Sequence, residues 1–188
     1  MPRAIHPIVA CALAAGTLLA AGAAAQEGGP ARFGFGTPAT AEQIRAWDID
    51  AGPDGEGLPP GSGTAAEGEA IYAAQCAACH GVNLEGVPAT GGETLIGGRG
   101  SLAGAAPLKT VESFWPYAPT LFDYIGRAMP FNAPGSLGAD EVYAVSAYIL
   151  FRAGLFSREA VLNAQTLPQV RMPNREGFRP DERPDTPR

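Results

Sequence analysis

The sequence predicts an all-α domain with an extended segment at each end. Three stretches have helical patterning, at residues 64–75, 119–128 and 139–153, and no strand-rich segment or internal repeat accompanies them. Glycine and proline gather outside these stretches, where they oppose regular structure. We divide the chain into a leader (1–25), an N-terminal arm (26–63), a helical domain (64–154) and a C-terminal tail (155–188).

The leader has the features of a secretory signal peptide. Arg3 provides a basic start, an unbroken apolar run covers residues 8–19, and alanines at 23–25 form a small-residue cleavage site. Cys11 ends a lipoprotein-like box, but only seven residues precede that box, so we favour cleavage after Ala25. The run is short for a membrane span. We therefore expect a periplasmic protein without a membrane span after cleavage.

The charge balance bears on the kind of partner. The chain has 13 basic and 19 acidic residues, a formal net charge of −6. Removal of Arg3 with the leader makes the excess of acidic residues larger. An acidic surface argues against nucleic acid and anionic membranes, and favours a partner with a basic docking patch. Solubility alone explains the same balance equally well.

The N-terminal arm contains one short helix signal. Thr40 to Gln43 has the capping-box form T-x-x-Q, which predicts a helix running to Trp47. Ile44 and Trp47 are three residues apart, so they share a face of that helix. We expect this small apolar face to anchor the arm by packing.

Each helix of the central domain has its own boundary signals. The first follows a capping box at Thr64 to Glu67. The second has Pro119 in its first turn and ends before Pro130. The third carries an apolar stripe at i, i+3 and i+7, formed by Val142, Val145 and Ile149. It ends at Gly154. Ser157 is expected to cap one or two further turns, to about Asn163, before prolines keep the tail extended.

Residues 76–80 read Cys-Ala-Ala-Cys-His, the attachment signature of c-type haem. Two thiols at this spacing add to the two vinyl groups, and the adjacent His80 supplies an iron ligand. Half of a zinc site and a redox C-x-x-C pair are the alternatives. A zinc site needs four ligands, and Cys76, Cys79 and His80 are the only Cys and His after residue 25. A redox pair would follow a strand, so the motif predicts one covalent haem.

The sixth iron ligand follows by elimination. Without a second histidine in the mature chain, Met129 and Met172 are the remaining usual ligands. Met129 follows a helix and precedes Pro130, whereas Met172 lies in the proline-rich tail, so we assign Met129. A His/Met pair raises the reduction potential, as in electron-transfer cytochromes. A haem enzyme or gas sensor would need an open or labile sixth position.

Other residues are expected to support the haem. The second ring nitrogen of His80 needs an acceptor, for which we expect the backbone carbonyl of Pro88. The glycine-rich stretch 81–100 lets the backbone run close to a flat ligand. Arg99, Trp115 and Tyr117 are candidates for bonding the haem propionates, although packing explains the aromatic residues equally well.

The spacing of Gly68, Tyr72 and Cys76 makes residues 64–154 resemble class I cytochrome c. The resemblance implies a class I cytochrome c fold, in which three main helices surround one covalent haem whose thioether edge is exposed. It also implies that Gly68 lets the first helix cross the last one closely, next to Tyr148.

Segments on both sides of that domain resemble the cytochrome subunit of Sox-type sulfane (sulfite) dehydrogenase. They include the following stretches: 38–40, 47–50, 53–55, 57–63, 109–111, 115–118, 140–144, 167–168 and 172–174. The resemblance implies an electron-transfer protein that receives electrons from a molybdenum-containing periplasmic dehydrogenase acting on sulfite or sulfane sulfur. A downstream cytochrome or oxidase would take them on. The Sox subunit commonly carries two haems, and this sequence has one C-x-x-C-H motif, so a general-purpose carrier for another dehydrogenase stays open.

The arm and tail together add about 70 residues to the cytochrome domain, too many for simple capping. We hypothesise that they wrap the domain and dock the dehydrogenase. The alternative is that they only cover apolar surface.

Overall fold

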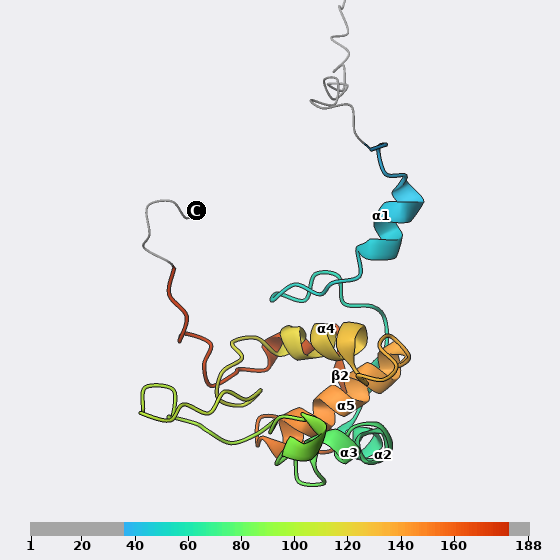
Figure 1. The fold of residues 1–188 in the computed structure, drawn as a ribbon. Coiled ribbons are helices and arrows are strands. Elements are labelled where there is room, and N and C mark those ends of the chain that lie inside the picture. The colour runs from blue at the N-terminus through green and yellow to red at the C-terminus, as the bar shows by residue number, and fades with distance from the viewer. Residues whose placement is uncertain (1–35, 181–188) are drawn as a thin grey trace, which may run out of the picture. The chain divides into compact units, whose positions relative to one another are not determined.

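The computed structural model describes residues 36–180, and the leader lies outside this range. Five α-helices form within it: α1 (Ala41–Trp47), α2 (Ala65–Gln75), α3 (Ala77–His80), α4 (Ala118–Ala128) and α5 (Ala139–Arg152) (Figure 1). Two 3₁₀ turns, at Pro88–Thr90 and Leu167–Gln169, and two short strands, β1 (Ser62–Gly63) and β2 (Leu162–Asn163), complete the elements. The described chain from Ala41 onward forms one compact unit, and residues 36–40 belong to another. The all-α prediction is confirmed, and each predicted helix in the arm and the central domain is present.

Helix α2 begins at the predicted capping box. The Glu67 backbone N–H donates to Thr64 Oγ1 at 3.3 Å, and the Thr64 backbone N–H donates to Glu67 Oε2 at 2.8 Å. Two backbone donors that the helix leaves free at its start are thereby satisfied. The Thr64 hydroxyl, which donates to Glu67 Oε2 at 2.8 Å, and then the Thr64 backbone N–H lower the pKa of the Glu67 carboxyl, because they favour its ionised form.

The crossing of α2 with α5 holds the domain together. A Cβ atom at Gly68 would overlap the carbonyl oxygen of Ala144 and lie 2.9 Å from Cβ of Tyr148, so only glycine permits this approach. One turn along α2, the rings of Tyr72 and Tyr148 pack at 5.2 Å between centroids. The predicted role of Gly68 and the position of Tyr148 beside α2 are confirmed.

Tyr72 links this crossing to the segment that follows α3. Its side chain is 1% exposed, and its hydroxyl donates to the carbonyl oxygen of Gly81 at 2.7 Å. Burial raises the pKa of Tyr72 well above its usual range. The hydroxyl therefore remains a hydrogen-bond donor at neutral pH and well into the alkaline range.

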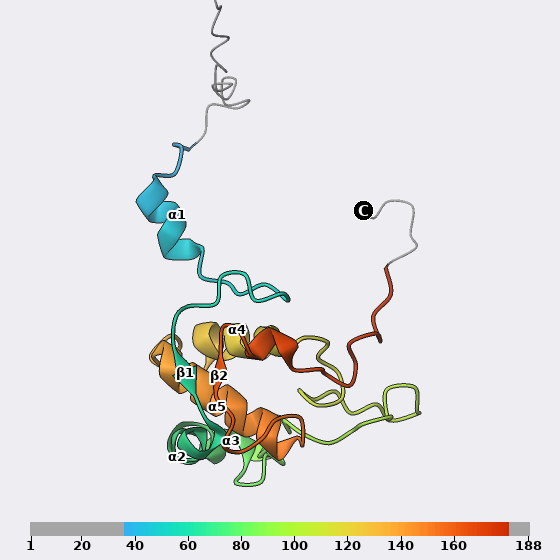
Figure 2. The same ribbon diagram turned by 180° about the vertical axis from the view of Figure 1, so that it is seen from behind.

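The tail adds residues to the core. Strand β2 pairs antiparallel with β1, Ser62 opposite Asn163 and Gly63 opposite Leu162 (Figure 2). Leu162, Leu167 and Met172 are at most 1% exposed and belong to the same apolar cluster as α2, α4 and α5. The prediction of helical turns after Ser157 is wrong, because no helix forms there and Leu162–Asn163 pair with the arm as a strand.

The arm is held to the domain by hydrogen bonds. The Ala51 backbone N–H donates to Asp123 Oδ1 of α4 at 2.9 Å, and the Ser62 N–H donates to Asp140 Oδ1 of α5 at 2.7 Å. The Tyr143 hydroxyl donates to the Pro59 carbonyl at 2.9 Å. Helix α1 is different, since none of its residues is buried. The expectation that its apolar face packs as an anchor is wrong for the described chain.

Among the described residues, no helix is long and apolar enough to cross a membrane.

We predict that Gly68→Val lowers the free energy of unfolding by about 2–3 kcal/mol, because the new side chain forces α2 away from α5. Gly126→Ala is the matched control. A Cβ at Gly126, also inside a helix, meets nothing within 4 Å, and alanine favours a helix over glycine by about 1 kcal/mol. Urea unfolding of both variants provides the comparison. Equal stabilities would contradict the close crossing.

We predict that Tyr72→Phe costs about 1 kcal/mol at neutral pH, because one buried hydrogen bond is lost. The folded-state pKa of Tyr72 is raised, so its contribution is complete below the unfolded value of about 10. The contribution is lost as pH rises through the folded pKa. Unfolding curves of both proteins at several alkaline pH values should therefore converge, and a constant difference would argue against this account.

Candidate haem site

The C-x-x-C-H motif lies at a break between two helices. Cys76 ends α2 and begins α3, whose single turn is closed by bonds from the His80 N–H to the Cys76 carbonyl and from the Gly81 N–H to the Ala77 carbonyl, both 2.9 Å. Both cysteines are free thiols, Cys76 half-buried and Cys79 exposed. One helical turn thus brings the two thiols and the imidazole together.

The environment of Cys76 argues against a redox-active pair. Burial, with a smaller effect from Cys79, raises the pKa of the Cys76 thiol to about 11. Redox-active C-x-x-C pairs have a lowered thiol pKa. The raised pKa of Cys76 therefore disfavours the redox reading of the motif.

The orientation of His80 is fixed by the backbone of the glycine-rich loop. Its Nδ1 atom lies 2.7 Å from the carbonyl oxygen of Glu93. Since a carbonyl only accepts, Nδ1 is the protonated nitrogen and Nε2 is left to bind iron. The expectation that the Pro88 carbonyl is this acceptor is wrong. That carbonyl accepts from the Gly91 N–H at 3.2 Å within a 3₁₀ turn.

Further backbone contacts press this loop against the motif. The Gly86 N–H donates to the His80 carbonyl at 2.7 Å, and the Val87 N–H donates to the Cys79 carbonyl at 3.0 Å. A Cβ at Gly92 would overlap the carbonyl of Cys79, so glycine is required there. The sequence predicted a close approach of this loop to the ligand. In the structure, the loop approaches the backbone of the C-x-x-C-H motif.

The two methionines have different environments. Met172 is 1% exposed within the apolar core. Met129 caps the end of α4, where its backbone N–H donates to the Ile125 carbonyl at 3.0 Å, and its half-buried side chain packs against the core cluster. Cys76 packs against the same cluster. Met129 therefore remains the predicted sixth ligand, since Met172 is a packing residue.

The three candidate propionate partners have contacts within the chain. Arg99 forms an ion pair with Glu112, and its Nη2 donates to the Ala153 carbonyl at 2.5 Å. Trp115 packs edge-on against Tyr124 at 5.7 Å, and the guanidinium of Arg175 lies 4.8 Å from the ring centroid of Tyr117. Arg99 thus has a structural role that the sequence did not reveal.

The donor groups present fit haem c. Two free thiols lie in one helical turn, an imidazole has its Nδ1 fixed by a carbonyl, and a half-buried thioether follows α4. The sequence missed the Glu93 carbonyl because a backbone acceptor is not encoded by residue type. The glycine-rich stretch, with its Gly91-Gly92 pair, was the signal of the tight loop that carries it.

Comparisons with known proteins agree with this geometry. The family model described as cytochrome c matches residues 65–151. No curated protein gives a significant match. Among solved structures, the chain is similar to one in the crystal structure of the sulfane dehydrogenase SoxCD from Paracoccus pantotrophus, with 44% sequence identity and a TM-score of 0.73, covering 82% of this chain and 75% of that chain. The protein therefore belongs to the cytochrome c family, as a class I c-type cytochrome and electron carrier that resembles a subunit of sulfane dehydrogenase.

Proposed function

We propose that this cytochrome holds one covalent haem c and accepts electrons in the periplasm from a molybdenum-containing dehydrogenase that oxidises sulfite or sulfane sulfur. It then passes them to a downstream cytochrome or oxidase of the respiratory chain. The observation that carries the proposal is the 44% identity to a chain of a sulfane dehydrogenase, over 82% of this chain. The acidic composition and the secretory leader support it.

The chain's own residues would hold the haem in a fixed environment. Cys76 and Cys79 would attach it, and His80, through Nε2, and Met129 would be the iron ligands. Bound haem supplies one-electron chemistry, and neither ligand has to leave during transfer. The Glu93 carbonyl orients His80 and raises its basicity as a ligand.

The electron count sets the role of the partner. Oxidation of sulfite to sulfate takes up one water and releases two electrons and two protons. A single haem iron accepts one electron, so a partner must release the two electrons in separate steps. In this proposal the cytochrome is an acceptor and the sulfur chemistry belongs to the dehydrogenase. Both cysteines of the motif would be joined to haem, so neither would be free to carry substrate sulfur.

A general-purpose carrier is the second candidate. It is favoured by one observation, the single C-x-x-C-H motif in the sequence. In that case the donor would be another dehydrogenase, and the site would be the same.

We predict that Met129→Ala opens the sixth position. The variant should bind added imidazole, and its reduction potential should fall, because a thioether ligand raises it. Met172→Ala is the contrasting variant: loss of a buried methionine should cost about 2–5 kcal/mol of stability and leave the haem spectrum unchanged. Absorption spectra, imidazole titration and potentiometry of both variants separate the two roles. Imidazole binding by the Met172 variant alone would reverse the assignment.

The function is tested by mixing oxidised holoprotein with the purified sulfite-oxidising dehydrogenase of the same organism, adding sulfite and following haem reduction. We expect fast reduction that depends on the enzyme. Omission of either sulfite or enzyme provides the controls. If the haem stayed oxidised although the dehydrogenase was active, the function would be that of a general-purpose carrier.

A further inference from the structure

Helix α1 and the residues after it present large apolar side chains to solvent. Trp47 is 86% exposed, Ile44 53% and Ile49 61%, and none of the seven residues of α1 is buried. A helix this short is marginal in water, and helical stability in proteins comes mainly from packing of an apolar face. Concentrated exposure of large apolar side chains marks an interaction site. Within the part of the chain that the structure describes, this apolar face is therefore left exposed.

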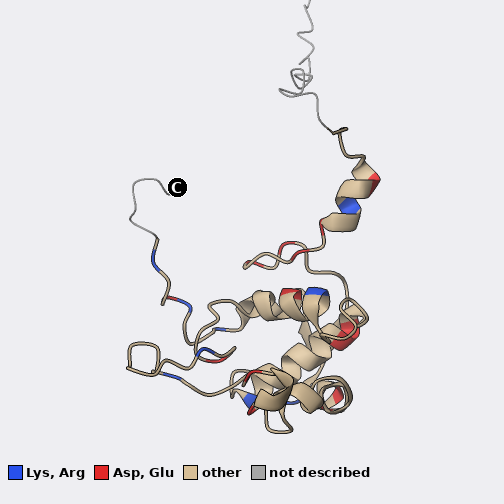
Figure 3. Cartoon of the chain, viewed as in Figure 1, with Lys and Arg blue, Asp and Glu red and all other residues tan. Residues whose placement is uncertain are grey.

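The same stretch is strongly acidic. Between residues 41 and 56 there are five acidic residues and one basic residue: Glu42, Asp48, Asp50, Asp54, Glu56 and Arg45. Figure 3 shows these acidic positions in red on α1 and on the stretch that follows it. Such a surface complements a basic patch with an apolar centre. It would repel another acidic surface, including a second copy of this stretch.

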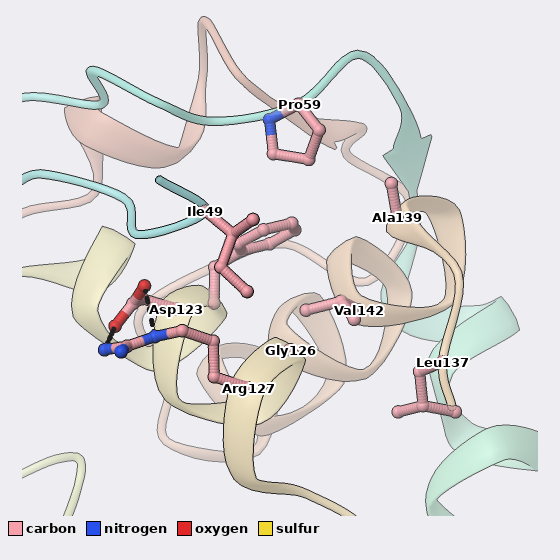
Figure 4. A pocket seen from close by; sticks show the side chains of 9 residues that line it. Ile49, Pro59, Asp123, Gly126, Arg127, Leu137, Ala139 and Val142 are labelled. Atoms are coloured by element: carbon pink, nitrogen blue, oxygen red, sulfur yellow. Dashed lines mark hydrogen bonds and ion pairs between the residues drawn. The ribbon is translucent and has the colours of Figure 1, made fainter. Parts of the chain in front are cut away.

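The stretch leads directly to a pocket on the domain. A pocket of about 170 Å³ is lined by Ile49 and by apolar residues of the domain: Phe122, Leu137 and Val142. Figure 4 shows Ile49, Leu137 and Val142 among the side chains around it. Asp123 and Arg127, which form an ion pair, also line it. Because Asp123 also accepts the Ala51 N–H at 2.9 Å, the arm is fixed to α4 beside this pocket. Helix α4 ends next to Met129, the predicted iron ligand.

The extent of the similarity indicates which partner covers this surface. The cytochrome c family model matches only residues 65–151, whereas the similarity to the sulfane dehydrogenase chain covers 82% of this chain. The shared sequence thus reaches well beyond the cytochrome domain, into segments that an ordinary cytochrome c does not need. A dehydrogenase subunit is the kind of partner for which such segments would be retained.

We propose that α1 and the acidic stretch to residue 56 form the docking surface for the dehydrogenase subunit, with Trp47 and Ile44 inserted into an apolar site bordered by basic residues. This inference rests on the proposed function. Trp47 is the energetic anchor, because tryptophan is enriched among the few residues that dominate binding. The surrounding carboxylates steer association and make its rate fall with salt.

The test measures binding and electron transfer together on full-length holoprotein. The purified sulfite-oxidising dehydrogenase subunit of the same organism is immobilised, and the dissociation constant is measured for Trp47→Ala, Trp47→Phe and the control Val161→Ala. Val161, in the tail, is 48% exposed, close to the exposure of Ile44. We expect about thirtyfold weaker binding for Trp47→Ala, recovery of most of the affinity in Trp47→Phe and no change in Val161→Ala. The haem spectrum should be the same in all.

A charge variant tests the second element of the surface. Glu42→Gln combined with Asp48→Asn should slow association and reduce its dependence on salt, whereas the exposed Glu159→Gln should do neither. If Trp47→Ala bound the dehydrogenase as tightly as the wild type, or if Val161→Ala weakened binding equally, the docking surface would be overturned. The proposed function would still stand. Failure of the wild type to bind the active dehydrogenase or to be reduced by it would overturn the function and this inference together.

Discussion

The close crossing of α2 and α5 at Gly68 is the contact on which the rest of the structure depends. Helix α2 leads without a loop into the cysteines of the haem motif, so the position of α2 sets the position of both thiols. The crossing is closed by the packing of Tyr72 and Tyr148 and continued by the Tyr72 hydroxyl bond to Gly81, immediately after the motif. A helix contact of a few residues therefore determines where the haem can be attached.

The glycine-rich loop acts as a backbone clamp for the motif. Its contacts to residues 79 and 80 are made by N–H and carbonyl groups, and the one side chain that takes part is the hydroxyl of Thr90. Such contacts need close approach, which explains why glycine is required at Gly92. The clamp fixes one nitrogen of His80 by a carbonyl, which leaves the other nitrogen available as an iron ligand. This arrangement holds the imidazole in one tautomer.

Local signals in the sequence were sufficient for the helices and for the cysteine motif. Capping boxes, Pro119 and the periodic stripe of α5 act within a few residues, and the structure follows them. Apart from the crossing at Gly68, which the family resemblance implied, long-range contacts were not predictable. The buried tail residues Leu162, Leu167 and Met172 are five residues apart, which matches neither a helix nor a strand. The acceptor for His80 is a backbone carbonyl, and any residue at position 93 offers the same group.

The two extensions of the domain use their apolar residues in opposite ways. The tail buries its leucines and Met172 in the core, and its strand pairs with β1, so it increases the apolar area that a small haem domain can bury. The arm contributes hydrogen bonds from residues 51–62 to α4 and α5 but leaves the apolar residues of α1 exposed. If extra apolar area were all that the extensions supplied, Trp47 would be buried as Met172 is. Because it is not, the arm and the tail differ in what they add to the domain, and the proposed docking is a role that fits the arm.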